Sequence, residues 1–330
     1  MELADIYQPI ATELKSVEEF LAASLRESKH PSILSLGDFV LESPGKRLRP
    51  ALAILSEKAA SAGETDGANR DDLIRVATAV ELIHLTALIH DDVLDHAKMR
   101  RGKPSVNAKW GDDVSIALGD YVYSKAFELV GRCRSPGLFS CISEAMYAMC
   151  EGELSQVCQR GDLELTRESY LLIISKKTAR PFAACCHAGT IIGNHSPNIQ
   201  EALRRFGWNF GIAFQIIDDC RDLISEEKTL GKRPGQDVLA GDITLPILTL
   251  LDVAGPSDRQ HVKNLLRLDT NGDSLRTIRD MFINSPALDI TVSTASSYVD
   301  QAKQCLRGLG SSDYRDSLTY LADYVTDGIL

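Results

Sequence analysis

The chain has 330 residues, of which 44% are hydrophobic, and it carries a net charge of −10 with an isoelectric point near 5.3. The acidic balance argues against nucleic-acid binding, which needs a basic surface, although local Lys and Arg groups can still hold anionic substrates. This length is at the upper limit for one hydrophobic core, but no Pro-, Gly- or Ser-rich linker and no internal repeat divides the chain. We therefore expect one domain over residues 1–330.

Apolar residues recur at helical spacing along nearly the whole chain, whereas the alternating Val, Ile and Thr runs typical of strands are nearly absent. The segments Ser61–Arg70, His96–Gly111 and Glu226–Gly241 are polar or Gly-rich, so we expect loops there, the last suited to a mobile flap. This order predicts an all-α fold, a large single-domain helix bundle. The expected helices cover residues 3–28, 32–42, 48–62, 71–95, 112–132, 137–160, 167–193, 198–226, 243–253, 257–268, 272–284, 289–307 and 312–326.

The N-terminal segment Met1–Phe20 is amphipathic and acidic, without the apolar core of a signal peptide. No uncharged apolar run reaches the ~20 residues that cross a bilayer. None of the eight cysteines forms a CxxC pair, and most lie in apolar stretches, which favours buried thiols in a reducing compartment over disulfides or zinc. We therefore expect a cytoplasmic protein without a transmembrane segment.

The helix expected from Leu73 to Asp95 is apolar nearly all round in its middle, and so is the helix around Phe206–Ile217, as is typical of helices inside a bundle. Each leads into a DDxxD cluster of carboxylates. A single cluster could equally be a solvated helix end or a functional site. Two such clusters at the ends of interior helices indicate a common function. Like charges on one helical turn repel unless cations neutralise them, and carboxylates suit Mg²⁺, which also binds substrate phosphates. The expected metal ligands are Asp91, Asp92 and Asp95 in the first cluster, and Asp218, Asp219 and Asp222 in the second.

Basic side chains of the kind that bind diphosphates lie near these clusters in the sequence. Any one of them is more often a surface charge. His84, seven residues before Asp91 on the same helix face, would by itself more often be a core residue. Together with the carboxylates they indicate an anion-binding site. The basic residues are Lys46, Arg47 and Arg49 after the Pro44–Gly45 break, Arg100 and Arg101, Lys176 and Lys177, and Lys228 and Lys232.

In these residues and their order, the chain resembles the trans-isoprenyl (polyprenyl) diphosphate synthase family. The resemblance implies the all-α isoprenoid synthase bundle with a central active-site cavity, usually as a homodimer. It also implies a Mg²⁺-dependent, head-to-tail trans condensation of isopentenyl diphosphate with an allylic diphosphate, which releases diphosphate and needs no nucleophilic Ser or Cys. The matching segments, in the family's order, are Gly45–Pro50, Glu81–His84, His90–Asp95, Arg100–Gly102, Gly119–Asp120, Gly152–Glu153, Lys177–Ala179, Phe214–Asp219, Leu230–Lys232, Asp237 and Thr244–Pro246.

The resemblance also implies a role for each matching residue. Both aspartate clusters would hold Mg²⁺, three ions per active site with Mn²⁺ as an alternative, and these ions would bridge the allylic diphosphate. The residues implied for the allylic diphosphate are Arg100, Lys177, Thr178, Gln215 and Lys232, of which Lys177, Thr178 and Gln215 are the expected catalytic residues. Those implied for isopentenyl diphosphate are Lys46, Arg49, His84 and Arg101.

The sequence departs from the family pattern at three places. Asp242 stands where many short-chain members have a lysine, which several longer-chain members also lack. Pro181 is expected to kink the helix that follows Lys177–Ala179, because proline removes a helical hydrogen bond. The last residues of the sequence, Asp327–Leu330, carry no basic group of the kind that would contact isopentenyl diphosphate.

Product length depends on how far the allylic tail can run down the helix that carries Asp91. One turn below that residue stand the small side chains of Thr86 and Ala87, where short-chain members often place a bulky floor. The tunnel should therefore continue, and we expect a product above the fifteen-carbon class, unless a more distant residue such as Phe139 closes it.

Two other functions are compatible with the same fold. A class I terpene cyclase would carry an Asn/Ser/Glu-type second metal motif and lack the isopentenyl diphosphate residues, whereas Lys46, Arg49 and Arg101 are all present. A non-catalytic or partner subunit of a heteromeric synthase would usually lose one aspartate-rich motif, whereas both are intact. The sequence leaves open the product length, the primer, the downstream pathway and the choice between homo- and hetero-oligomer.

Overall fold

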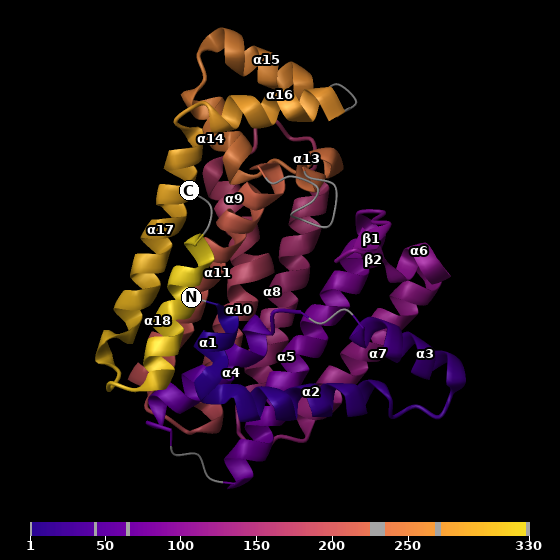
Figure 1. Cartoon of the computed structure of the whole chain (residues 1–330), viewed down its shortest axis with the longest axis vertical. Coiled ribbons are helices and arrows are strands. Elements are labelled where there is room, and N and C mark those ends of the chain that lie inside the picture. The colour runs from indigo at the N-terminus through magenta and orange to yellow at the C-terminus, as the bar shows by residue number, and fades with distance from the viewer. Residues whose placement is uncertain (1, 43–44, 64–66, 225–234, 268–271, 328–330) are drawn as a thin grey trace. The chain divides into compact units, whose positions relative to one another are not determined.

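A computed structural model of the chain describes residues 2–42, 45–63, 67–224, 235–267 and 272–327 (Figure 1). These residues are mostly helical, with one hairpin whose two strands have two residues each, which confirms the all-α prediction. The elements in chain order are α1 (Leu3–Tyr7), α2 (Ala11–Leu25), α3 (Pro31–Leu41), α4 (Leu48–Ala60), α5 (Gly67–Leu94), β1 (Met99–Arg100), β2 (Lys103–Pro104), α6 (Val106–Trp110), α7 (Asp112–Gly131), α8 (Leu138–Cys158), α9 (Arg167–Ile174), α10 (Arg180–Ile192), α11 (Pro197–Ile224), α13 (Gln236–Ala240), α14 (Leu245–Val253), α15 (Pro256–Arg267), α16 (Gly272–Ile283), α17 (Ala287–Cys305) and α18 (Asp313–Thr326).

The chain contacts divide these residues into two compact units. Unit 1 comprises Met1–Glu144, Phe182–Gly207 and Cys305–Leu321, and unit 2 comprises Ala145–Pro181, Trp208–Gln304 and Ala322–Leu330. The first aspartate cluster belongs to unit 1 and the second to unit 2. The prediction of a single domain over residues 1–330 stays a prediction.

Helix α5 is the centre of unit 1 and packs against α2, α4 and α7 (Figure 1). The side chains of Leu73, Val76 and Leu82 in α5 are fully buried, as the all-round apolar pattern predicts. By length and composition, Asn69–Leu94 is the one candidate membrane span among the described residues, with a mean hydropathy of 1.5. Because 61% of that window is buried inside the protein, α5 fits the description of a core helix.

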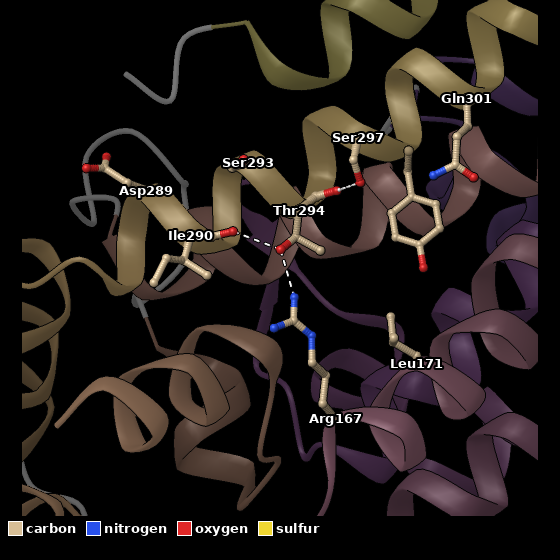
Figure 2. A pocket seen from close by; sticks show the side chains of 9 residues that line it. Arg167, Leu171, Asp289, Ile290, Ser293, Thr294, Ser297 and Gln301 are labelled. Carbon is tan, nitrogen blue, oxygen red and sulfur yellow. Dashed lines mark hydrogen bonds between the residues drawn. The ribbon is translucent and has the colours of Figure 1, made fainter.

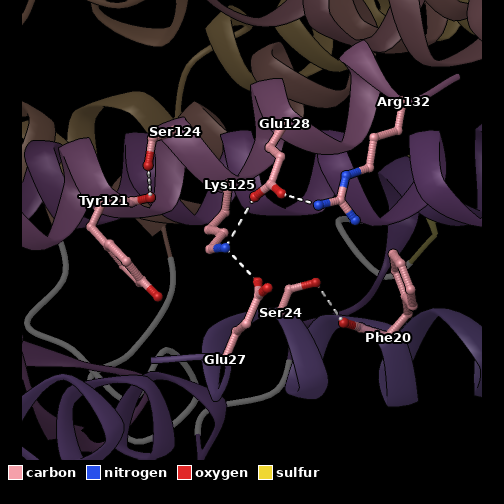
Figure 3. A network of polar contacts seen from close by, with 8 residues as sticks. All are labelled: Phe20, Ser24, Glu27, Tyr121, Ser124, Lys125, Glu128 and Arg132. Atoms are coloured by element: carbon pink, nitrogen blue, oxygen red, sulfur yellow. Dashed lines mark hydrogen bonds and ion pairs between the residues drawn. The ribbon is translucent and has the colours of Figure 1, made fainter. Parts of the chain in front are cut away.

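The contact between α5 and α7 depends on a glycine. A Cβ atom built at Gly119 in α7 would lie 2.0 Å from Nε2 of His90 in α5, so no larger residue fits without moving the histidine. An ion pair joins α7 to the segment that follows α2 (Figure 3): Lys125 pairs with Glu27, and its Nζ also lies 3.0 Å from Oε2 of Glu128 within α7. Such surface pairs stabilise little, and packing of the apolar faces dominates.

In unit 2, α9 continues towards α10 through a single π-helical turn, Ser175–Ala179, in which the N–H of Arg180 bonds the carbonyl of Ser175. Pro181 is the physical reason. It has no N–H to offer Lys177 four residues earlier, and its ring needs extra space there, which the wider π turn provides. The helix predicted over residues 167–193 is therefore present, and the disturbance expected at Pro181 takes the form of this turn.

Two short helices fall in segments predicted as loops. Helix α6 lies within His96–Gly111 and begins where Ser105 caps it, with Oγ 3.3 Å from the N–H nitrogen of Ala108. Helix α13 lies within Glu226–Gly241, of which residues 226–234 are outside the described part of the chain. The flap expected there is thus described only from Gly235 onward.

Candidate active site

The first aspartate cluster lies at the C-terminal end of α5. Asp92 is buried, and the guanidinium of Arg100 in β1 binds it closely: Nε lies 2.8 Å from both carboxylate oxygens, and Nη2 lies 2.7 Å from Oδ1. Asp95 is exposed and Asp91 partly so. The structure therefore pairs Arg100 with Asp92 of the cluster and leaves Asp95 exposed and Asp91 partly exposed. The role of Arg100 towards the allylic diphosphate stays a prediction.

A second group of cations lies around His84, seven positions earlier in α5. Burial holds the pKa of His84 well below its usual range, and the charges of Arg49, Arg101, Arg100 and Arg47 act in the same direction. The imidazole is therefore neutral at pH 7 and can accept or donate a hydrogen bond. Cationic groups crowded in this way favour an anion in the space they share.

Arg49 is partly buried, with its guanidinium carbon 4.5 Å from the ring centroid of Phe182. Such stacking fixes the orientation of the guanidinium group. Lys46 and Arg101, the other cations predicted to hold isopentenyl diphosphate, have exposed side chains. Unit 1 thus gathers Arg49, Arg101 and His84, and supplies Lys46 from the same short segment as Arg49.

Arg47 differs from its basic neighbours because carboxylates hold it on both sides. Its Nη2 lies 3.0 Å from Oε2 of Glu18 in α2, and its Nη1 lies 2.7 Å from Oε1 of Glu81 in α5. Its backbone is left-handed, with φ of 53°, a conformation unfavourable for a residue with a side chain. The Tyr7 hydroxyl also donates to the carbonyl of Lys46 at 2.9 Å. These contacts fix the segment that carries Lys46 and Arg49.

The second aspartate cluster lies near the C-terminal end of α11 and takes part in a chain of hydrogen bonds. The Thr178 hydroxyl donates to Oε1 of Gln215 at 2.7 Å, and Nε2 of Gln215 donates to Oδ1 of Asp219 at 2.7 Å. The Tyr170 hydroxyl donates to Oδ2 of Asp219 at 2.6 Å. The structure therefore brings together three predicted residues, and it adds Tyr170.

Burial raises the pKa of Asp219 to about 7; the hydrogen bonds from Tyr170 and Gln215 oppose the rise, while the charges of Asp218 and Asp222 add to it. Asp218 is exposed, and Asp222 is buried with Oδ2 accepting from the N–H of Asp237 at 3.1 Å. A cation bound at this cluster would lower the pKa again, because it favours the charged form of the carboxylates.

Lys177 lies in the π turn, where π-helical residues are often functional. Its Nζ is 2.5 Å from Oε2 of Glu153 and 3.1 Å from Oε1 of Gln156, both in α8. A Cβ atom built at Gly152 would lie 2.6 Å from the backbone nitrogen of Lys177, so the Gly152–Glu153 pair lets α8 approach the π turn. Lys232, predicted for the same substrate, lies outside the described residues.

The donors of the two clusters fit a hard divalent cation. Oxygen ligands alone suit Mg²⁺, which keeps several waters, takes one or two protein carboxylates and completes its shell with substrate phosphates. Within the described ranges, no three His, Cys, Asp or Glu side chains converge into a site that could hold an ion. Asp95 and Asp218 are exposed and Asp91 is partly exposed, so these carboxylates could supply part of the coordination of an ion that also binds substrate phosphates.

The remaining predicted residues concern product length. Thr86 is fully buried and Ala87 partly buried. Phe139 is 54% exposed and lies against Phe127, with ring centroids 5.9 Å apart.

A surface groove of about 740 Å³ lies between α9 and α17 (Figure 2). None of the predicted residues lines it, and across it Arg167 donates to Oγ1 of Thr294 at 2.7 Å.

Sequence reasoning missed Tyr170, Glu18 and Gln156. Each acts only through a contact with a residue far away in the sequence, and no spacing signal announces such contacts. Glu153 was noted only as part of a matching segment, and Asp242 only as a departure from the family pattern.

Comparison with known proteins decides the family. The sequence model of the polyprenyl synthetase family matches residues 30–281. The chain belongs to this family. It is 33% identical over 333 residues to a short chain isoprenyl diphosphate synthase of Methanothermobacter thermautotrophicus, covering 99% of both chains. It is 31% identical to heptaprenyl diphosphate synthase component 2 of Bacillus subtilis, covering 98% of this chain and 90% of the relative.

The fold is similar to that of a polyprenyl synthase from Caulobacter crescentus, solved in complex with calcium and isoprenyl diphosphate. The TM-score is 0.93 at 32% identity, over 98% of this chain and 97% of the other. The family, the isoprenoid synthase fold and the reaction class predicted from the sequence are thereby confirmed: the chain is a trans-prenyltransferase of the polyprenyl diphosphate synthase type.

Proposed function

We propose that the two groups of residues bind two different substrates of the condensation. Lys46, Arg49, His84 and Arg101 hold isopentenyl diphosphate. Arg100, Lys177, Thr178, Gln215 and Lys232 serve the allylic diphosphate, together with Mg²⁺ on the aspartates of both clusters. The observation that carries this division is the group of guanidiniums around His84, of which Arg49 lies stacked on Phe182.

The allylic substrate must lose diphosphate, and negative charge develops on the leaving oxygen as the C–O bond breaks. Bound Mg²⁺ ions would stabilise that charge as Lewis acids. Arg100 is oriented by its closely bound partner Asp92, and Lys177 by Glu153 and Gln156, so both cations are in place before the reaction. Apolar residues of the interior helices exclude water from the allylic cation, and the double bond of isopentenyl diphosphate then attacks it. The new cation loses a proton, which the released diphosphate can accept, and the double bond of the longer product forms.

The test is incubation of the purified protein with isopentenyl diphosphate, Mg²⁺ and a series of allylic primers, followed by chromatography of the products. Products longer than the primer by whole isoprene units are expected, and above fifteen carbons if the small residues at 86 and 87 leave the path open. No incorporation of isopentenyl diphosphate would contradict the proposal. A cyclic terpene formed without isopentenyl diphosphate would identify a cyclase instead.

We further propose a homodimer, supported by an exposed apolar stripe on α8. Phe139, Tyr147 and Leu154 are 54%, 72% and 66% exposed, and their spacing of eight and seven residues places them on one helix face. Large apolar side chains gathered in this way mark an interaction surface. Substitution of Tyr147 by Glu should shift the protein to a monomer in light scattering. If the wild type is monomeric and gains activity only with a second protein, a heteromeric enzyme is indicated.

The cytoplasmic location is likewise a proposal, supported by the burial of α5 and the eight free cysteines. We also propose three Mg²⁺ ions per active site, as the family resemblance implies. Mn²⁺ is the alternative, and reaction rates measured with each metal would distinguish the two.

A further inference from the structure

Asp242 lies in a tight turn that packs on the C-terminal end of α8. It follows Gly241, whose φ is 86°, and the Gly241 carbonyl accepts a hydrogen bond of 2.7 Å from the N–H of Gly161. The side chain of Asp242 is 6% exposed. Its Oδ2 accepts from Nε2 of Gln156 at 2.7 Å, and its Oδ1 accepts from Nε of Arg160 at 3.2 Å. A buried carboxylate is tolerated here because both oxygens have donors.

Gln156 connects this carboxylate to Lys177. Its amide nitrogen donates to Asp242, while its carbonyl oxygen lies 3.1 Å from Nζ of Lys177. The two ends of a glutamine amide are not equivalent, since the nitrogen only donates and the oxygen only accepts. A carboxylate at Asp242 therefore selects the orientation in which the oxygen faces the ammonium group. Without that carboxylate the amide is free to turn and present its nitrogen to Lys177, which would repel it.

Lys177 is thus held by two acceptors one helical turn apart on α8, Glu153 and Gln156. A lysine side chain is flexible, and its ammonium is a point charge without preferred geometry. Two fixed acceptors reduce that freedom before any substrate arrives.

We propose that Asp242 and Gln156 are positioning residues that orient Lys177 towards the allylic diphosphate. The inference rests on the role proposed above for Lys177. It also accounts for the departure at this position: where many short-chain members of the family have a lysine, this chain has a carboxylate that acts through Gln156.

The test compares Asp242→Leu, Gln156→Met, their double variant and Lys177→Ala in initial-rate kinetics. Asp242→Leu and Gln156→Met should each raise the KM for a farnesyl diphosphate primer, by up to roughly tenfold, the range for one weakened charge-assisted contact, without changing the KM for isopentenyl diphosphate. Because both act along one path, the double variant should be no worse than the poorer single variant. Glu164→Gln, which breaks a surface pair with Lys263 in the same unit, is the matched control and should change neither constant.

Multiplying effects in the double variant, or an equal rise of both KM values, would overturn the positioning role. If Lys177→Ala raises the KM for the primer and the Asp242 and Gln156 variants do not, only this inference fails. If Lys177→Ala leaves that KM unchanged, the proposed allylic site fails and the inference with it. Should Asp242→Leu not fold, Asp242→Asn keeps the volume and one acceptor, and a smaller rise in the same KM is expected.

Discussion

Thr86 donates a hydrogen bond from its hydroxyl to the backbone carbonyl of Gly119, with Oγ1 3.3 Å from the carbonyl oxygen. The contact turns Thr86 towards α7 and buries it completely, whereas Ala87 stays partly exposed. The two residues put forward for product length therefore differ in their surroundings, and of the two only Ala87 keeps part of its surface exposed.

We expect Ala87→Phe to shorten the product, because each turn of α5 covers about 5.4 Å, close to the length of an isoprene unit. Thr86→Phe should instead overpack the contact with α7 and cost about 1–3 kcal/mol of stability. Product lengths from a geranyl primer and thermal melting of both variants provide the check. A folded, active Ala87→Phe protein with the wild-type product distribution would place the floor elsewhere. Phe139 is less suited to that role, since more than half of it is exposed.

Both aspartate clusters should be required for activity. Asp91→Ala or Asp218→Ala should lower kcat by orders of magnitude, because each removes a ligand of the ions that stabilise the leaving diphosphate. Chelation should abolish activity and added Mg²⁺ should restore it. Asp300→Ala, an exposed aspartate on α17, serves as the control. Near-normal turnover of either cluster variant, with an unchanged helical circular dichroism spectrum, would exclude the metal-bridged leaving group.

Arg49 should contribute to the KM for isopentenyl diphosphate and not to that for the primer. Arg49→Ala removes a charge-assisted contact, which corresponds to a rise of roughly tenfold or more. Arg49→Lys keeps the charge but loses the planar group above Phe182, so part of the defect should remain. Arg132→Ala, on the exposed ion pair with Glu128 in Figure 3, is the matched control. A rise in the KM for the primer alone would reverse the assignment of the two substrates.

The lowered pKa of His84 predicts that the free energy of unfolding decreases as the pH is lowered. Below about 6.5 the unfolded chain binds a proton at His84 that the folded protein does not bind, so acid favours unfolding. Between pH 7.5 and 5.5 the wild type should lose on the order of 1 kcal/mol more than His84→Gln. Urea unfolding at the two pH values measures the difference. Equal losses in both proteins would mean that His84 is charged in the folded state.

The long helices could be predicted from the sequence because their apolar periodicity extends over many turns. The first cluster and Arg100 were predicted together because they are neighbours in the chain. Helices α6 and α13, with five residues each, are too short for a periodic signal. The contacts that hold Lys177 could not be predicted either. Its partner Gln156 bonds Asp242, which lies 86 positions further along the chain, and only the folded turn at Gly241 brings these two residues together.

The contacts of Arg47 also bear on where the protein can be cut. The family match begins at residue 30, yet Tyr7 and Glu18, which hold the backbone of Lys46 and the guanidinium of Arg47, come before it. A protein trimmed to the matched region would keep every residue assigned to substrate but lose Tyr7 and Glu18, two of the residues that hold the segment carrying Lys46 and Arg47. The first 25 residues belong to no substrate-binding motif, but they are needed to hold the segment with Lys46 and Arg49 in place.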